Sequence, residues 1–471
     1  MTSRWRQTVC VFAVFARIAA GAERPPADAA QQVSRVDEVI RQVMEKKTIP
    51  GLSLAVVRGG QLVMAIGYGM ANLEWQAPAT AETVWQIQSM TKSFTATGIM
   101  LLVEDGKLKV DDKVSAYLDG TPEKWKNITI RHLLTHTSGI EDFINQPTAS
   151  LRLDVTEEEV LKATAPRPLN FQPGERYAYS NTNYHLLAMI IRKVTGKAYG
   201  DFLRERIFEP LGMRDTRVNN LSEIVPRRAA GYKLGPDGWR NGEIIAPTVL
   251  AYGGGGLLST VLDLVKWDAA LDTEKILKKA TLEQMWTPAT LNNGKATTYG
   301  FGWSVETIAG HRCISHGGAH VTGFLSFFAR YPNDRLTVIV CVNCMGLGIE
   351  RLARRVAGVF VPALTPGEPH VIEDKEPEVA GRLKAMYAHW VAGEDAGTRF
   401  TLPLAKELTK AKRDELVEWL GPLQTLGLLE SKADGDAHYY RYLATFQSMS
   451  MILHVRFNKD GEISEFRANL E

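Results

Sequence analysis

The chain has 471 residues, which is more than one small domain needs and suits one large domain together with a smaller one. Hydrophobic residues make up 45% of the sequence and charged residues 23%, as is typical of a folded globular protein. With 55 basic and 53 acidic residues, the formal net charge is only +2, which argues against nucleic acid or a charged membrane surface as the partner.

Residues 1–22 have the features of an export signal. Two arginines precede an apolar segment at residues 9–16, and Ala20-Gly21-Ala22 forms a small-residue cleavage site. We therefore expect cleavage after Ala22 and a periplasmic or secreted protein. A disordered or membrane-associated amino terminus is the alternative, because Arg17 interrupts the apolar segment. No later segment approaches ~20 consecutive apolar residues, so we expect no membrane-spanning helix after removal of the signal.

The large domain is predicted to begin with a helix and a hairpin. Residues 23–33 are predicted as a flexible lead-in, and Ser34 as the N-cap of a helix whose apolar stripe has helical spacing. Residues 52–57 and 62–68 are predicted as the two strands of a β-hairpin.

Ser89 and Lys92 form a Ser-x-x-Lys motif before an apolar run, residues 94–103, that predicts a buried helix. A serine in the first turn lies near the positive end of the helix dipole, where developing negative charge is stabilised. Lys92 follows three residues later on the same face, so its amine can reach the Ser89 oxygen. A buried amine can lose its proton near neutral pH and act as a base. The motif alone would also fit an N-capped helix with a solvated lysine.

Two further motifs follow along the chain. Tyr179-Ser180-Asn181 comes after a loop with proline and glycine and just before a predicted helix at residues 182–194. His316-Gly317-Gly318 follows a short apolar strand, and a strand-like run at residues 323–331 comes after it. A second Tyr-x-Asn match, Tyr331-Pro332-Asn333, is predicted as a hairpin turn because it has turn-forming residues.

A domain boundary is predicted at residues 362–377, which are rich in proline and charge. This linker leaves residues 34–361 as the large domain and residues 378–471 as a small α+β domain. Two helical patterns there precede four strand-like runs with alternating apolar residues, which predict an antiparallel meander. The small domain holds no recognisable catalytic set, so substrate gating, oligomerisation and structural support are all open to it.

In type and order, the three motifs resemble the signature of the penicillin-recognising serine hydrolases, Ser-x-x-Lys, Tyr-x-Asn and Lys/His-x-Gly. Residues 102–108, 128–139 and 253–260 also resemble the class C β-lactamase-like family, which includes D-aminopeptidases, DD-peptidases and esterases. The resemblance extends over roughly residues 33–361. It implies an α+β fold of the β-lactamase/transpeptidase type, with an antiparallel sheet flanked by helices and a helical subdomain. Strands predicted near both ends of this region, with helices between them, favour the same architecture.

The resemblance implies that Ser89 forms a covalent acyl-enzyme and that Lys92 and Tyr179 share the role of base. Each of the two is a poor base at its free pKa. A nearby cation favours the phenolate, whereas desolvation favours the neutral amine, so we expect the pair to titrate as a unit. Asn181 would contact the carbonyl side of the substrate.

The resemblance also implies an oxyanion hole made by the backbone N–H groups of Ser89 and of Ala319, the residue after Gly318. Gly317 and Gly318 would let the strand approach the acyl group without side-chain collision, and a loop hinge is the alternative. His316 stands where class C β-lactamases carry lysine, and a histidine is charged only below a pKa of ~6.5. With His316 binding substrate, this departure favours esterase, amidase or D-amino-acid peptidase activity over efficient β-lactam hydrolysis.

No metal or cofactor is expected. His132 and His136 have i,i+4 spacing but lack the glutamate and third ligand of a zinc site, so a structural role is predicted for both. Residues 253–256 are four glycines without a following Lys-Ser/Thr pair, which predicts a flexible loop beside the site rather than a phosphate-binding loop. The cysteines that remain after processing are predicted to be buried thiols: Cys313, Cys341 and Cys344.

The motifs together predict an exported, cofactor-free serine hydrolase that cleaves an ester, amide or D-amino-acid peptide through a Ser89 acyl-enzyme. Its expected partner is a small-molecule or peptide substrate. Alternatives are a DD-carboxypeptidase or penicillin-binding protein, and a class C-type β-lactamase. A rival of another class is a non-catalytic peptidoglycan sensor with the same fold. The sequence leaves the leaving group and the oligomeric state open.

Overall fold

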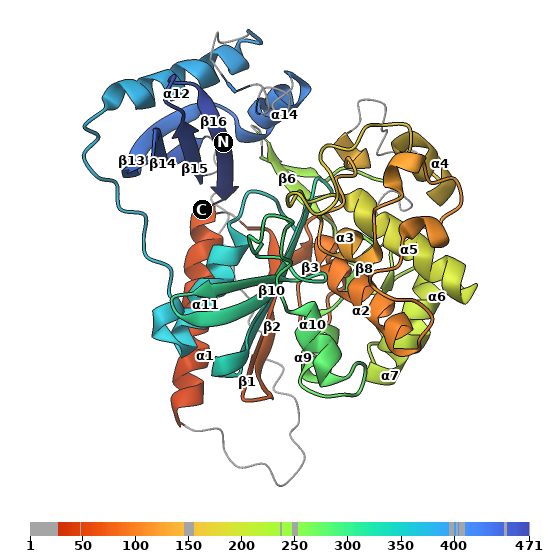
Figure 1. Cartoon of the computed structure of the whole chain (residues 1–471). Coiled ribbons are helices and arrows are strands. Elements are labelled where there is room, and N and C mark those ends of the chain that lie inside the picture. Colours follow the sequence, from red (N-terminus) through yellow and green to blue (C-terminus); the bar gives the residue numbers. More distant parts are fainter. Residues whose placement is uncertain are drawn as a thin grey trace. The chain divides into compact units, whose positions relative to one another are not determined.

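Figure 1 shows the computed structural model of the chain, which describes residues 27–47, 49–145, 155–235, 238–246, 253–394, 400–401, 404, 410–446 and 450–470. The predicted signal peptide, residues 1–22, lies outside these residues. The chain divides into two compact units: the first includes the described residues up to 233, then 239–345 and 352–365, and the second includes 234–238, 346–351 and 366 onward. The domain limits inferred from the sequence, 34–361, 362–377 and 378–471, stay predictions. Within the described ranges, no helix combines the length and the apolar character needed to cross a membrane.

A seven-stranded antiparallel sheet organises the first unit. Its strands, in order across the sheet, are β3 (Ala77–Pro78), β2 (Gln61–Asn72), β1 (Gly51–Arg58), β12 (Leu336–Val342), β11 (Phe324–Tyr331), β10 (His311–His320) and β9 (Ser304–Ile308). β1 pairs with β12 so that Leu54 lies opposite Val340, which joins the beginning of the unit to its end. A short turn, η6 (Pro332–Asp334), joins β11 to β12 as predicted. The predicted antiparallel sheet and its hairpin are confirmed.

Helices cover both faces of the sheet (Figure 1). α1 (Ala27–Lys47) packs against β2, whereas α9 (Val261–Leu271) packs against β1 and β12. α11 (Ile349–Phe360) follows β12, as predicted. The predicted N-cap at Ser34 is wrong, because α1 begins at Ala27 and includes residues that we assigned to the flexible lead-in. Alanine and glutamine, which dominate residues 27–33, are good helix formers and extend the helix backward.

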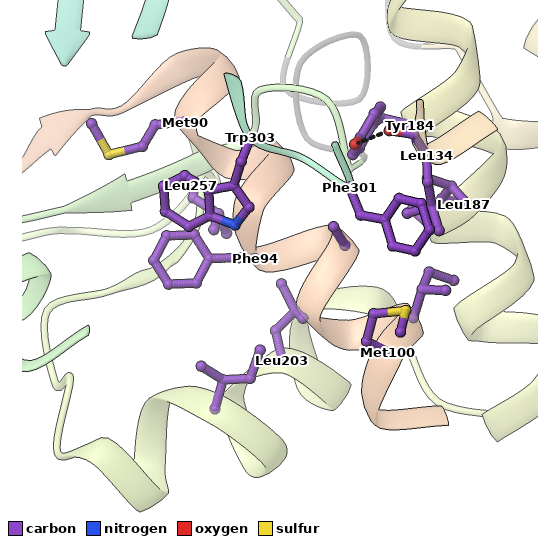
Figure 2. Packing of buried hydrophobic residues seen from close by; sticks show 14 of the residues in the cluster. Met90, Phe94, Met100, Leu134, Tyr184, Leu187, Leu203, Leu257, Phe301 and Trp303 are labelled. Carbon is purple, nitrogen blue, oxygen red and sulfur yellow. Dashed lines mark hydrogen bonds between the residues drawn. The ribbon is translucent and has the colours of Figure 1, made fainter. Parts of the chain in front are cut away.

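The predicted helical subdomain surrounds one buried helix, α2 (Thr91–Glu104), whose residues from Thr91 to Leu102 are all buried. Figure 2 shows Phe94 and Met100 of α2 among apolar side chains from segments far apart in the sequence. The hydroxyl of Tyr184 in the same cluster donates a hydrogen bond to the Leu134 carbonyl at 2.8 Å. A helix that is apolar on every side is stable only where other elements enclose it, so α2 forms the centre of this part of the fold.

Shorter elements complete the first unit around α2. The helices are α3 (Ile130–Leu134), α4 (Glu157–Thr164), α5 (Asn181–Thr195), α6 (Tyr199–Leu203), α7 (Glu209–Leu211) and α10 (Lys279–Met285). The strands β4 (Trp85–Gln86), β8 (Leu257–Ser259) and β5 (Arg217–Val218) form a small sheet in that order. Two more short strands contain residues assigned to both units: β6 (Tyr232–Gly235) and β7 (Gly238–Asn241).

The second unit contains a four-stranded antiparallel sheet, which confirms the predicted meander. Its strands lie in sequence order: β13 (Leu423–Asp434), β14 (Ala437–Phe446), β15 (Ser450–Phe457) and β16 (Ile463–Leu470). Alternate residues of β14 and β15 are buried, in agreement with the period of two. The helices α12 (Pro377–Val391) and α14 (Lys410–Leu420) supply the rest of the core, which includes Trp390 and Leu420.

Replacing Trp303 with alanine should lower the free energy of unfolding by about 3–5 kcal/mol, because the indole is fully buried and packs against Phe328 with ring centroids 5.7 Å apart. Urea denaturation measures the change. The matched control is Trp75→Ala, since Trp75 is 83% exposed and its loss leaves no cavity. Equal stability of the two variants would contradict the packing described for the first unit.

Candidate active site

Ser89 lies on a tight turn where a short strand meets the buried helix. The turn is η1 (Gln88–Met90), which follows β4 and continues directly into α2. Gln88 has φ of 49°, a left-handed conformation that favours glycine and strains other residues. Its side-chain amide donates hydrogen bonds to Gln86 Oε1 and Thr322 Oγ1, both at 3.0 Å. These contacts hold the strained residue directly before Ser89 in place.

Lys92 is fully buried and its amine contacts three oxygen atoms. Nζ lies 3.2 Å from Ser89 Oγ, 2.9 Å from Asn181 Oδ1 and 2.7 Å from the Gly254 carbonyl oxygen. Both carbonyl-type oxygens can only accept, so they take the two N–H bonds of a neutral amine and leave its lone pair for the Ser89 hydroxyl. Burial lowers the pKa of Lys92 to about 7, although the charge of Asp142 acts in the opposite direction. Near neutral pH the amine is therefore available as a base.

Tyr179 lies on the other side of the same serine. Its ring centroid is 4.6 Å from Lys92 Nζ, and the Ser89 side chain is near enough to its hydroxyl to act on the Tyr179 pKa. Although 38% of the residue is exposed, burial around the hydroxyl raises the pKa of Tyr179 and outweighs the opposing effect of Ser89. Desolvation thus acts more strongly than mutual charge stabilisation on both groups, and it favours a neutral phenol beside a neutral amine.

Asn181 is the first residue of α5 and connects the amine to a buried carboxylate. Its Oδ1 accepts from Lys92, while its Nδ2 donates to Asp142 Oδ2 at 2.8 Å. The backbone N–H of Asn181 donates to the same carboxylate oxygen at 3.0 Å. We did not predict Asp142 from the sequence, because it follows the segment 128–139 without a recognisable motif of its own.

His136, for which a structural role was predicted, packs beside the site. Its ring lies 4.3 Å from the Tyr179 ring, centroid to centroid, and its Nδ1 accepts from the Ser180 backbone N–H at 3.2 Å. Its φ of 55° is in the left-handed region, another strained backbone position beside the candidate catalytic groups. The only sequence signal was this histidine within the segment 128–139.

His316 lies on β10 as a buried, neutral residue. Its Nδ1 is 2.6 Å from the Gly317 carbonyl oxygen, so it carries the proton, and its Nε2 accepts from the Tyr299 hydroxyl at 2.9 Å. Burial, with a smaller contribution from Lys92, lowers the pKa of His316 to about 3. Both ring nitrogens already have partners within the protein, and the substrate-binding role of His316 stays a prediction.

The glycines of β10 bring this strand against the serine turn. A Cβ atom on Gly318 would lie 2.3 Å from the Ile87 carbonyl oxygen and 2.8 Å from Gln88 Cβ. Such contacts require glycine, so the close approach of β10 to the residues before Ser89 depends on Gly318. Ala319, the next residue, is therefore held at the same edge of the site as the Ser89 turn.

The remaining candidates have the positions expected of supporting residues. His132 accepts from the Thr129 backbone N–H at 3.2 Å in a capping box of α3, as a structural residue would. The predicted glycine loop does lie beside the site, because the Gly254 carbonyl accepts from Lys92. The thiols of Cys313, Cys341 and Cys344 are buried, as predicted.

Comparisons with known proteins agree with this geometry. A family model described as Beta-lactamase matches residues 36–359. Penicillin-binding protein 4* of Bacillus subtilis is 34% identical over 317 residues, which is 64% of this chain and 69% of that protein. The D-amino acid amidase from Ochrobactrum anthropi matches with a TM-score of 0.63 and 29% identity, over 71% of this chain and 99% of that chain.

One solved structure also covers most of the second unit. The penicillin-binding protein homologue from Pyrococcus abyssi, described as octameric, matches with a TM-score of 0.61 and 26% identity. The match covers 93% of this chain and 99% of that chain. Together with the amidase, this likeness confirms the predicted architecture of an antiparallel sheet flanked by helices, with a small α+β region at the carboxy terminus.

We expect the Lys92 amine to titrate near pH 7, well below the ~10.4 of an ordinary lysine, because it is enclosed in the protein. Carbon-13 NMR of the lysine Cε resonances in isotopically labelled protein measures this directly. Lys92→Met should remove the one early-titrating resonance and leave the others unchanged. Titration of every lysine resonance in the ordinary range would show that the amine is solvated.

Proposed function

Because the chain belongs to the Beta-lactamase family of serine hydrolases, we propose that it cleaves an ester, amide or D-amino-acid peptide through an acyl-enzyme on Ser89. The observation that carries the proposal is the arrangement around the Lys92 amine. Asn181 and Gly254 occupy its two N–H bonds, and the lone pair is left for the Ser89 hydroxyl. An alcohol becomes an effective nucleophile when an adjacent base takes its proton, and this arrangement supports Lys92 in that role.

In the proposed acylation, Ser89 Oγ attacks the acyl carbon while the hydroxyl proton moves to Lys92. The Tyr179 hydroxyl would pass a proton to the leaving group and be reprotonated by Lys92, whose Nζ lies 4.6 Å from the Tyr179 ring centroid. The bond to the leaving group breaks, and Ser89 holds the acyl group as an ester. In the second half, Tyr179 is the favoured activator of the water that hydrolyses this ester. Asn181 would contact the carbonyl side of the substrate.

The proposed oxyanion hole uses the backbone N–H groups of Ser89 and Ala319. Its support is the approach of β10 to η1, which Gly318 permits. Two aligned donors would stabilise the charge that develops on the carbonyl oxygen, and the loss of one such donor typically costs ~10²–10³ in rate.

The surroundings of the site favour substrates without a required carboxylate. His316 is neutral at physiological pH because burial lowers its pKa to about 3, so it supplies no fixed cation for a penicillin-like anion. The likeness to a D-amino acid amidase supports the same class of substrate. We therefore propose an esterase, amidase or D-amino-acid peptidase. Export to the periplasm or the medium remains part of the proposal, on the sequence of residues 1–22 alone.

The similarity to penicillin-binding protein 4* supports DD-carboxypeptidase or β-lactamase activity as the alternative enzymatic function. A DD-carboxypeptidase would form a stoichiometric penicillin adduct that decays slowly, whereas a β-lactamase would turn over nitrocefin rapidly. Rapid nitrocefin turnover would also contradict the argument from His316. A non-catalytic peptidoglycan sensor would be acylated by substrate without releasing product. Assays with p-nitrophenyl esters, D-alanine anilides and nitrocefin separate these functions.

Ser89→Ala should reduce hydrolysis of the active substrate to background and abolish labelling by a fluorophosphonate probe. The matched control is Ser93→Ala on α2, since the Ser93 hydroxyl donates to the Met90 carbonyl at 2.9 Å and has no part in the proposed reaction. That variant should still be labelled. Persistent labelling of Ser89→Ala would rule out Ser89 as the nucleophile.

Gly318→Ala should lower kcat by about 10²–10³, because the added methyl group would displace β10 from the Ser89 turn and remove the Ala319 donor. Gly317→Ala is the control, since its nearest neighbour would be the Phe327 ring at 3.2 Å, which is a side chain that can shift. Steady-state kinetics, with circular dichroism to verify folding, measure both. Equal activity of the two variants would argue against the proposed oxyanion hole.

A further inference from the structure

A buried carboxylate lies behind the residue that contacts the Lys92 amine. Asp142 is 9% exposed and comes from the connection that precedes α4. Its Oδ2 accepts from both the backbone N–H and the side-chain Nδ2 of Asn181, at 3.0 and 2.8 Å. Its Oδ1 accepts from the Ile144 backbone N–H at 3.2 Å. Three N–H donors thus converge on one carboxyl group.

This set of donors favours the ionised form of Asp142. A protonated carboxyl would need an acceptor for its own proton, and none of these three contacts supplies one. Burial raises the pKa of Asp142, while the hydrogen bonds from Asn181 and Ile144 and the nearby Lys92 act in the opposite direction. The three converging N–H donors nevertheless favour the carboxylate, which can only accept.

Because the carboxylate can only accept, it fixes which end of the Asn181 amide faces which neighbour. Nδ2 must point to Asp142, and Oδ1 is therefore turned toward Lys92 Nζ, 2.9 Å away. The reversed amide would place an NH₂ group against the amine and remove one of its two strict acceptors. An N–H bond of Lys92 could then point toward Ser89 in place of the lone pair.

We propose that Asp142 is a positioning residue that orients the Asn181 amide and, through it, directs the Lys92 lone pair toward Ser89. The inference rests on the proposed function, because the direction of the lone pair matters only if Lys92 takes the proton of Ser89. Asp142 itself contacts neither Ser89 nor the reacting atoms through any hydrogen bond described above. Its hydrogen bonds reach the proposed catalytic groups through Asn181, whereas its charge acts on Lys92 directly.

The charge of Asp142 can be detected through the pKa of Lys92. A residue with only a structural role would leave that pKa unchanged. The titratable groups with electrostatic or ring contact to Lys92 are Asp142, Tyr179, Tyr184, His136, His316 and His320. Burial raises the pKa of the two tyrosines and lowers the pKa of the three histidines, so all five are neutral near pH 7. Asp142 is the charged member of this set besides Lys92 itself. Removal of its charge should therefore lower the pKa of Lys92 further below 7.

The experiment compares Asp142→Asn with Asp142→Ala. The asparagine can still accept from Asn181 but has no charge, so we expect kcat/KM to rise with pH through a lower midpoint than in the wild type, with a plateau reduced less than about 10-fold. The alanine leaves Asn181 free to reverse, and we expect its plateau to fall by about 10²-fold, the cost of a misplaced reacting group. The lysine Cε titration measures the change in the Lys92 pKa without any substrate.

The matched control is Asp263→Asn in the first turn of α9. Asp263 is 2% exposed, and its Oδ2 accepts from the Asp215 backbone N–H and the Thr216 hydroxyl, an arrangement like that of Asp142. This variant should cost stability but leave the pH profile and the Lys92 titration unchanged. Thermal unfolding of each variant separates lost folding from lost positioning.

Two results would overturn the inference: an unchanged Lys92 titration midpoint in Asp142→Asn, or equal plateaus for the asparagine and alanine variants. If Asp142→Ala does not fold, the asparagine variant still tests the charge. Failure of the proposed function has a different signature. In that case Ser89→Ala remains active or labelled, whereas the lysine titration continues to report on Asp142 independently.

Discussion

The structure of the site depends on keeping the Lys92 amine out of water. Desolvation brings its pKa to about 7, so the amine can be neutral at a pH where an exposed lysine is almost wholly charged. This requires α2 to be enclosed on every side, and the packed residues from Thr91 to Leu102 provide that enclosure. It also requires partners for the two N–H bonds, which Asn181 and Gly254 supply from distant parts of the chain. The packing around α2 therefore forms the apolar core and also keeps the Lys92 amine out of water.

A second constraint is the distance between β10 and the serine turn. The sheet is built from strands at both ends of the first unit, and β10 reaches the site only because β11 and β12 connect it to β1. Gly318 then allows the strand to approach Ile87 and Gln88 more closely than any side chain would permit. The site thus combines a helix start, a loop before α5 and a strand edge, each held by different tertiary contacts.

Much of this arrangement could be predicted from short-range patterns. Ser89 and Lys92 are three residues apart on one helix, so local geometry alone brings them together. The four strands of the second unit also followed from their alternation. The start of α1 was misplaced because an N-cap candidate at Ser34 outweighed the helix-forming residues before it. Asp142 was missed because its partner, Asn181, is far away in sequence and no motif marks an aspartate that binds an asparagine.

The strained residue before the serine has one more consequence. Glycine would adopt the left-handed conformation of Gln88 at little cost, yet it would have no side chain to reach Thr322 beyond the end of β10. The amide of Gln88 therefore links the turn that carries Ser89 to the bend that follows β10. One side-chain hydrogen bond thus ties the position of Ser89 to that of a loop residue 234 positions after Gln88 in the sequence.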